Sequence, residues 1–259
     1  MLKKITVAIA LTGLMAGAAY AGINAGEGIT GSLHDMNYSR ISGTPDEFKR
    51  ACVFCHTPHN AKNDKTYTTN APLWNRVDTT LTAPTPYTWA APANAAYEAD
   101  GKTPKILIGD PLLGPTRLCM GCHDGSIAVD SHGSKTGLIK MPTTSKAYVK
   151  DLTITHPIGF DYDAAYAARG VNELIPSTGH FITGAVGQAF KTQAADRPAA
   201  LTAGGKLISD TLYGGTMTCA SCHEVHNTNN AKPVVPGAYN YFLRAQEEGS
   251  AICLSCHIK

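Results

Sequence analysis

Long apolar runs are scarce in this 259-residue chain. The run from residue 5 to about 19 is too short to span a membrane comfortably, and no later segment approaches that length. Two lysines precede it and Ala19-Tyr20-Ala21 follows it, a pattern typical of a secretory signal peptide cleaved after Ala21. No cysteine precedes Cys52, so a lipid anchor on an N-terminal cysteine is not expected. We therefore expect residues 1–21 to be removed and the protein to be exported without a membrane span.

A surplus of charge of either sign is also missing. Removal of the leader takes away two lysines and no acid, so the 22 basic residues fall to 20 and equal the 20 acidic ones. Binding to phosphate backbones needs a basic surplus, so a nucleic-acid partner is not expected. Low net charge leaves little repulsion between copies, which permits self-association.

No cysteine is spare, because all eight fall in four Cys-x-x-Cys-His motifs. This pattern indicates covalent haem attachment: the two thiols add to the haem vinyl groups and the histidine is the proximal iron ligand. A disulfide framework or a zinc ribbon would not account for the histidine in every motif. We predict four covalently attached haem c groups, named haem one to haem four in motif order. The motifs are Cys52, Cys55 and His56; Cys119, Cys122 and His123; Cys219, Cys222 and His223; Cys253, Cys256 and His257.

The ratio of chain to cofactor predicts the fold class. After cleavage there are roughly 60 residues per haem, too few for a conventional apolar core around each one. We expect a single multihaem cytochrome c domain over 22–259, with an N-terminal arm at 22–43, that is mostly coil with short helices and few or no strands. The chain would wrap around a stack of four haems that takes the place of the core, with Trp74 and Trp89 against haem edges. Without haem the chain should not fold.

Local patterns predict a few regular elements. Thr-Pro-Asp-Glu at 44–47 resembles a helix N-terminus and predicts a helix that runs into the first motif. A short helix is expected over 160–167, ending near Gly170. A short β-hairpin is possible between 170 and 218, and the composition of 238–248 favours a helix leading into the fourth motif.

Motifs one and three, but not two and four, carry a second histidine three residues after the first, followed by Asn. We call these the extended motifs; their second histidines are His59 and His226. The alternation resembles a two-haem unit used twice. A histidine one turn beyond the proximal ligand cannot reach the other face of its own haem. We therefore predict that His59 ligates haem two and His226 ligates haem four, the alternative being surface histidines near a haem.

Haems one and three still need distal ligands. By elimination these are His34, in the arm, and His156, where the following proline extends the backbone. His132 and His180 remain as spares. With six histidines for four vacancies, bis-histidine ligation is favoured over ligation by methionine. The methionines considered are Met36, Met120, Met141 and Met217.

The motifs Cys-Val-Phe-Cys-His-Thr-Pro-His-Asn, Cys-His-Asp-Gly and a terminal Cys-Leu-Ser-Cys-His, with His34-Asp and His156-Pro-Ile-Gly, resemble the outer-surface multihaem c-type cytochromes of metal-reducing bacteria. The likeness is strongest to the tetrahaem, filament-forming members. It implies a homopolymer with an unbroken stack of bis-histidine haems, in which a histidine of one subunit ligates a haem of the next. His34 is the natural candidate to cross, to haem three, leaving His156 for haem one. An arm folded back on its own subunit would satisfy the same iron.

The resemblance implies a protein that is not an enzyme but carries electrons along the haems, from redox partner proteins to extracellular acceptors, at the outer surface or outside the cell. One alternative is a monomeric periplasmic tetrahaem shuttle. Another is a multihaem enzyme that reduces oxyanions, which would need one iron with an open coordination position.

Overall fold

The computed structural model describes residues 28–30, 32–37, 45–59, 61, 73–76, 108–132, 135–149, 151–152, 155–182, 206–227 and 240–258. In these residues the chain forms short helices joined by irregular segments, and it forms isolated antiparallel bridges but no strand. This agrees with the prediction of coil with short helices. The α-helices are α2 (Pro115–His123), α3 (Tyr162–Arg169), α5 (Cys219–Cys222) and α6 (Ala251–Leu254). The 3-10 helices are η1 (Ala51–Phe54), η4 (Ser209–Thr211), η5 (Asn240–Phe242) and η6 (Glu248–Ser250).

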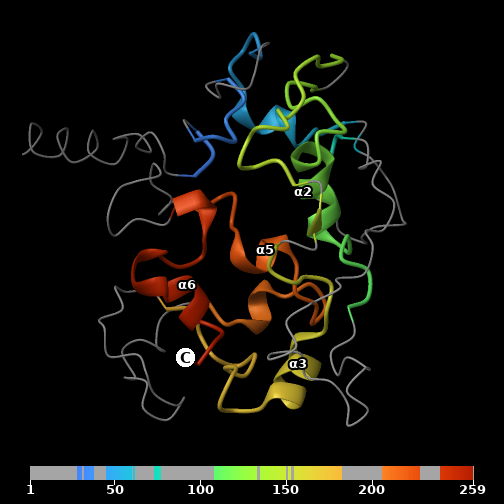
Figure 1. Cartoon of the computed structure of the whole chain (residues 1–259). Coiled ribbons are helices and arrows are strands. Elements are labelled where there is room, and N and C mark those ends of the chain that lie inside the picture. Colours follow the sequence, from blue (N-terminus) through green and yellow to red (C-terminus); the bar gives the residue numbers. More distant parts are fainter. Residues whose placement is uncertain are drawn as a thin grey trace, which may run out of the picture.

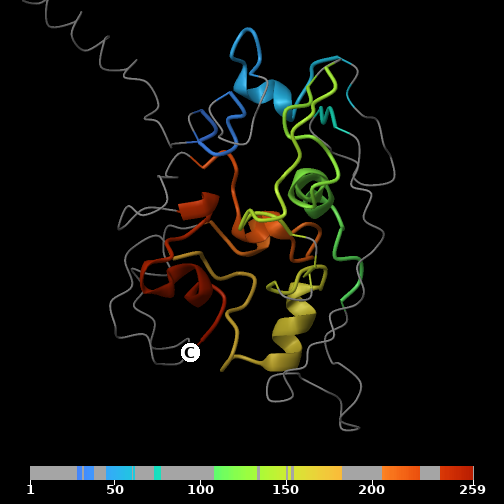
Figure 2. The same ribbon diagram turned by 45° about the horizontal axis from the view of Figure 1, so that its top comes forward.

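The helices that carry the four motifs follow one another through the molecule. From the top to the lower left of Figure 1 they come in the order η1, α2, α5 and α6. The rotated view in Figure 2 keeps that order. The motifs therefore lie in space in the order in which they occur in the sequence.

Helix α2 starts where a glycine turns the chain beside an aromatic ring. Gly114 has φ of +58°, and a Cβ there would lie 2.6 Å from the ring of Tyr213. Pro115 occupies the first turn, where its missing N–H costs nothing. Thr116 is fully buried, and its Oγ1 accepts a hydrogen bond from the backbone N–H of Cys219 at 3.2 Å. This bond joins α2 to α5 and so joins motif two to motif three.

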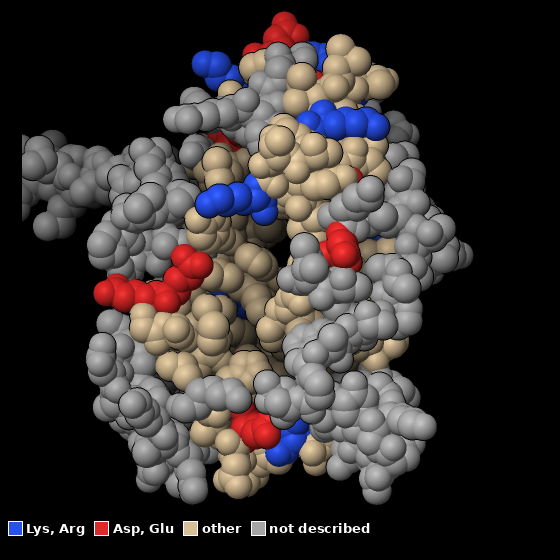
Figure 3. Space-filling model, viewed as in Figure 1, with Lys and Arg blue, Asp and Glu red and all other residues tan. Residues whose placement is uncertain are grey.

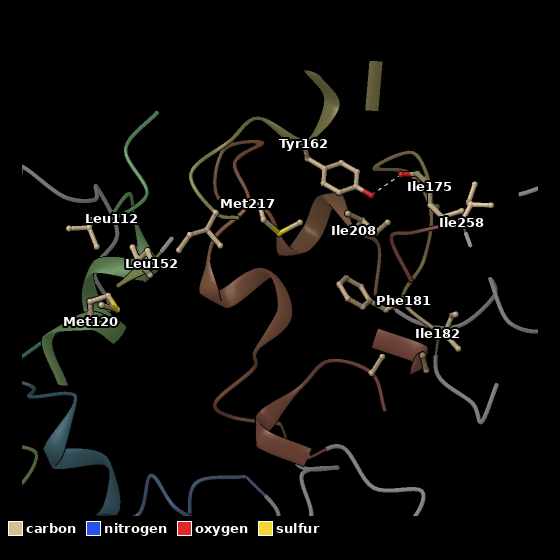
Figure 4. Close-up of a cluster of buried hydrophobic side chains, with 13 residues drawn as sticks. Leu112, Met120, Leu152, Tyr162, Ile175, Phe181, Ile182, Ile208, Met217 and Ile258 are labelled. Carbon is tan, nitrogen blue, oxygen red and sulfur yellow. Dashed lines mark hydrogen bonds between the residues drawn. The ribbon is translucent and has the colours of Figure 1, made fainter. Parts of the chain in front are cut away.

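Helix α3 confirms the helix predicted around 160–167. The Asp161 carboxylate accepts from the backbone N–H of Ala164 at 2.7 Å and caps the first turn. Gly170, with φ of +82°, ends the helix as expected. The hydroxyl of Tyr162 donates to the carbonyl of Ile175 at 2.8 Å, which joins α3 to the segment that follows it (Figure 4).

The helix predicted to run from 44 into the first motif is wrong. Residues 45–50 form turns instead, because Asp46 uses its carboxylate locally. Its Oδ2 accepts from the backbone N–H groups of Phe48 (3.1 Å) and Arg50 (2.9 Å), and the Arg50 guanidinium binds both oxygens. Only the single turn η1 carries motif one.

The helix predicted over 238–248 is also wrong in the described part. Tyr241 and Phe242 have φ of +53° and +59°, and Ser250 has φ of +59°. Left-handed backbone at non-glycine residues breaks a helix. The chain therefore reaches motif four through two separate 3-10 turns.

Other predicted features lie partly or wholly outside the described residues. The leader, Trp89 and most of the arm are among these. For the hairpin predicted between 170 and 218, the described residues contain two isolated antiparallel bridges, His180 with Leu207 and Tyr213 with Thr216, and no strand.

The prediction that haems replace the apolar core is only partly right. Thirteen buried hydrophobic residues form one cluster, all from residue 112 onwards (Figure 4). Helices α2, α3 and α6 each contribute to it. The polypeptide therefore has a small apolar core of its own, on the side of motifs two, three and four. Its members are Leu112, Met120, Leu152, Ile158, Tyr162, Ile175, Phe181, Ile182, Ile208, Met217, Ala245, Ala251 and Ile258.

Candidate haem and electron-transfer site

Each motif closes on itself as a helical turn. In motifs one, three and four, the backbone N–H of the histidine donates to the carbonyl of the first cysteine at 2.9, 3.0 and 2.9 Å, respectively. Motif two lies within α2. A helical turn places side chains three positions apart on one face, and all eight cysteines are free thiols. Each motif thus presents two thiols together with an imidazole.

The thiols of motifs two and three touch. The Cys119 thiol donates a hydrogen bond to the Cys219 sulfur, which raises the pKa of Cys119 well above its usual range and lowers that of Cys219. The two attachment sites are therefore in direct contact.

The thiols of the other consecutive motifs lie near enough to each other to interact electrostatically. Burial raises the pKa of Cys55 to about 11, and Cys122 of motif two adds to the rise. Burial likewise raises the pKa of Cys222 to about 12, with Cys256 of motif four contributing. Motifs one and two, two and three, and three and four are thus each in proximity, which makes a continuous row.

A short segment returns to pair with motif one. The backbone N–H after His56 donates to the carbonyl of Leu73 at 2.9 Å, and the N–H of Asn75 donates to the carbonyl of Cys55 at 3.1 Å. His56 and Trp74 form an antiparallel bridge. The Trp74 indole lies edge-on to the His56 ring, with centroids 5.9 Å apart.

An equivalent segment pairs with motif three. The N–H after His223 donates to the carbonyl of Phe242 at 2.7 Å, and the N–H of Arg244 donates to the carbonyl of Cys222 at 2.9 Å. His223 and Leu243 form the matching bridge.

We call residues 73–76 and 242–245 the return segments. Their first residues, Leu73 and Phe242, have nearly the same left-handed backbone, with φ of +55° and +59°. The same pairing is thus built twice, once on each extended motif. This repetition supports the interpretation of the chain as a two-haem unit used twice.

Three pairs of histidine rings lie face to face or edge to face. Each pair joins the histidine of a Cys-x-x-Cys-His sequence to a histidine that is not part of such a sequence. Two imidazoles on opposite sides of one metal, each bound at about 2 Å, have ring centres about 6 Å apart. The observed pairs match that spacing. They are His34 with His123 at 5.9 Å, His56 with His226 at 6.3 Å, and His156 with His257 at 6.1 Å.

Three histidine rings, two of them from these pairs, are held in the tautomer that binds a metal through Nε2. In each case Nδ1 donates to a backbone carbonyl, which fixes the ring and leaves the Nε2 lone pair free for a metal. The bonds run from His123 to Ala147 (2.8 Å), from His223 to Tyr241 (2.8 Å) and from His156 to Pro157 (2.9 Å).

His34 is suited to the same role by its surroundings. Burial, together with the nearby rings of His123, His223 and His226, lowers the pKa of His34 to about 4. The ring is therefore neutral near pH 7, as a metal ligand must be. It also stacks on Phe242, with centroids 4.6 Å apart.

These residues fit covalently bound haem c. The paired thiols would hold the porphyrin, and the facing imidazoles would ligate the iron from both sides. Figure 3 shows the middle of the molecule deeply hollowed and bordered mainly by uncharged residues, as an apolar macrocycle requires.

The ring pairs differ from the predicted ligand pairing. His226 faces His56 of motif one, not His257 of motif four. His156 faces His257, not His56. Sequence spacing correctly excluded His226 as a ligand of its own haem. It could not identify which other haem each histidine reaches, because that depends on how distant segments of the chain pack together.

The arm folds back on its own chain. His34 lies against His123 of motif two in the same chain, whereas the prediction paired it with haem three, either of the next subunit or of its own. The backbone N–H of Gly28 donates to the carbonyl of Asn227 at 2.8 Å, which fastens the arm to the end of motif three.

Four histidines remain outside these pairs, and two of them, His132 and His180, are the predicted spares. His132 is buried, its Nδ1 bonds the carbonyl of Asp130 at 3.1 Å, and its Nε2 lies 3.4 Å from Asp46 Oδ1. These contacts suit a structural histidine. His180 lies in the bridge to Leu207.

Methionine is disfavoured as a ligand by its position. Met120 and Met217 belong to the buried apolar cluster, and Met141 is also buried. Met36 is half-buried in the arm, two residues after a histidine that already faces motif two.

His223 and His59 are left. Among the described residues, which include all ten histidines, the pairs found do not include His223, the proximal ligand of haem three. His59, of the first extended motif, is exposed.

A family model described as the doubled CXXCH motif matches residues 214–259, which contain motifs three and four. Neither the curated proteins nor the solved structures gave a match. Within the described residues, no helix has the length and apolar character needed to cross a bilayer. The matched motif indicates a multihaem c-type cytochrome that takes part in electron transfer.

Proposed function

We propose that this multihaem c-type cytochrome is an exported electron-transfer protein, not an enzyme, that binds four haem c groups with bis-histidine ligation and assembles into a conductive extracellular filament. The observation that carries the proposal is the continuous row of motif thiols, Cys55 to Cys122, Cys119 to Cys219 and Cys222 to Cys256. One direct thiol contact and two closely spaced thiol pairs thus bring successive attachment sites close enough for electrons to pass between them.

Haem supplies reversible one-electron transfer when bound. The chain fixes the attachment sites through the motif turns and the return segments. The facing imidazoles would close both sides of the irons of haems one, two and four, so that small molecules would find no open position there and oxyanion reduction is disfavoured. Donors and extracellular acceptors would then exchange electrons at the ends of the row.

The repeat supplies the missing ligand of haem three. In the chain, the second histidine of the later extended motif, His226, faces the motif histidine of the earlier one, His56. The plain motifs follow a second rule: each is paired with a histidine that precedes its own unit, His34 for motif two and His156 for motif four. If His223 is paired as His56 is, its partner must be the second histidine of an extended motif that follows it.

A second copy of the chain begins with such a motif. His59 of that copy would stand to His223 as His226 stands to His56. Because His59 is exposed, it is accessible to a neighbouring molecule. A contact between unlike surfaces that does not close on itself generates an open filament.

Replacing His59 with Ala tests this arrangement. We expect four attached haems, loss of filaments in negative-stain microscopy, and one high-spin ferric haem per chain in the electron paramagnetic spectrum. His180→Ala is the matched control and should keep filaments and low-spin haem. Normal filaments of the His59 variant with four low-spin haems would exclude the crossing.

The alternative is a monomeric periplasmic shuttle between redox partner proteins. It is favoured if the secreted wild-type protein elutes as a single particle at every concentration and leaves one haem high-spin or ligated internally. Rapid carbon monoxide binding to every reduced haem would argue against bis-histidine ligation altogether.

A further inference from the structure

Arg76, in the first return segment, is a buried cation held entirely by backbone. Its side chain is 6% exposed. Its Nε donates to the carbonyl of Phe54, between the two cysteines of motif one. Its terminal nitrogens donate to the carbonyls of Ala128 (2.7 Å), Val129 (2.7 Å) and Ser131 (3.0 Å). Four of the five guanidinium N–H donors are thus used, so the charge is fixed in position and has little capacity left for another ligand.

No carboxylate in the described part of the chain neutralises this charge by an ion pair. The nearby Asp46 is paired with Arg50 at 2.7 Å. Asp130, in the loop that Arg76 contacts, directs its Oδ1 to the backbone N–H of Ile139 at 2.9 Å. The positive charge of Arg76 is therefore uncompensated by direct contact.

The guanidinium lies beside the attachment sites of haems one and two. Burial raises the pKa of the Cys55 and Cys122 thiols, and Arg76 acts on both in the opposite direction, as a nearby positive charge must. Motif one is contacted directly through Phe54.

The second return segment offers an internal comparison. Arg244 directs its Nε to the carbonyl of Ala220, between the two cysteines of motif three, at 2.9 Å. Its Nη1, however, forms an ion pair with Oε2 of Glu224 at 3.0 Å. Arg244 is the third residue of its return segment and corresponds to Asn75, whereas Arg76 is the fourth. Each extended motif thus has an arginine against the residues between its two cysteines, and an ion pair neutralises only the charge beside motif three.

We propose that Arg76 is a potential-setting residue, which holds the reduction potential of haem one above that of haem three. Reduction adds one electron from the donor to the ferric iron, and a fixed positive charge nearby stabilises the added negative charge. The effect is larger where little water screens it. The inference rests on the proposed haem attachment but not on filament formation.

The test is a redox titration of the purified holoprotein, followed by NMR of the shifted haem methyl signals so that each midpoint is assigned to its haem. In wild type, the midpoint of haem one should be more positive than that of haem three. Arg76→Gln should move the midpoint of haem one to lower potential and leave haem three unchanged. Arg76→Lys keeps the positive charge but loses hydrogen bonds. The midpoint of haem one should therefore stay close to the wild-type value although thermal stability falls, whereas a purely structural role would make the two change together.

Glu224→Gln is the matched variant at motif three and leaves Arg76 intact. Removal of the carboxylate should move the midpoint of haem three to higher potential and narrow its difference from haem one. This arm remains informative if Arg76→Gln fails to fold. A haem one midpoint at or below that of haem three in wild type, or an unchanged haem three in Glu224→Gln, would overturn the inference. Failure to find four attached haems would instead count against the proposed function.

Discussion

At the scale of single residues, the position of one imidazole decides which haem it can serve. His226 follows His223 by three residues, so its ring leaves the same turn and cannot return to the far side of that haem. The sequence allowed this exclusion. It did not identify His56 as the partner, because that contact joins residues 170 positions apart and depends on the docking of the whole second unit.

The attachment residues are the opposite case. The eight cysteines and the four motif histidines follow from local spacing alone, because a single turn must carry both thiols and the proximal ligand. The charge at Arg76 was not found from the sequence. An isolated arginine in a Thr- and Pro-rich tract gives no signal that its partners are the carbonyls of 128–131.

The pairing of His34 gives a prediction at this scale. In His34→Ala, haem two should lose its distal ligand, so about one haem per chain should become high-spin and bind carbon monoxide when reduced. Electron paramagnetic resonance and carbon monoxide difference spectra measure this. Attachment through Cys119 and Cys122 should be unaffected, so the haem count should stay at the wild-type value.

Met36→Ala is the control, because it alters the same arm without removing an imidazole. If the His34 variant kept every haem low-spin, the ring contact between His34 and His123 would not represent ligation.

At the scale of elements, local signals succeeded where they acted alone and failed where another partner was available. Helix α3 begins after Asp161 and ends before Gly170, as expected of an N-capping aspartate and a C-capping glycine. Asp46 has the same type as Asp161, but the guanidinium of Arg50 lies four residues away and draws its carboxylate into a turn. The left-handed residues Leu73 and Phe242 also have no sequence signature, because neither is Gly, Asn or Asp.

The start of α2 yields a prediction with a built-in control. Gly114 and Gly214 have almost equal φ, +58° and +55°, but a Cβ at Gly114 would clash with Tyr213, whereas nothing lies within 4 Å of a Cβ at Gly214. An alanine in left-handed backbone costs about 1–2 kcal/mol of strain, and the cost at Gly114 should be at least this, because its ψ of −131° lies outside the left-handed helical region. Gly114→Ala should lose a further 1–3 kcal/mol, approximately, through overpacking.

Thermal or denaturant unfolding of the two holoproteins, followed by haem absorbance, measures the difference. Equal destabilisation by the two variants would mean that the Tyr213 ring moves aside without cost, and that α2 does not depend on this contact for its position.

At the scale of the whole molecule, the apolar cluster and the row of haem sites divide the chain unequally. Every member of the cluster lies at or beyond residue 112, whereas motif one is held by Arg76, Asp46 and short backbone pairings. The low number of residues per haem led to the prediction that haem groups form the interior. It could not show that the apolar residues of 112–258 gather into a single group.

This inequality predicts an asymmetric response to loss of haem. Cys52→Ala combined with Cys55→Ala should remove haem one and expose 45–59 and 73–76 to proteases, while the other three haems and the cluster persist. Cys253→Ala combined with Cys256→Ala should disturb the cluster itself, since Ala251 and Ile258 belong to it. Limited proteolysis with mass spectrometry distinguishes the two.

Uniform protease sensitivity in both double variants would mean that the cluster has no stability of its own and that the chain depends equally on every haem.

The paired return segments have a consequence for how such a chain can grow. Each unit has its own return segment, and in the proposed filament each unit would also supply a distal histidine to the unit before it, so every copy would carry what is needed to join the next. Insertion of a third unit would lengthen the path for charge without altering either terminus. A single gene of this design can therefore change the reach of its product by duplication alone, with the contact surfaces at both ends kept as they are.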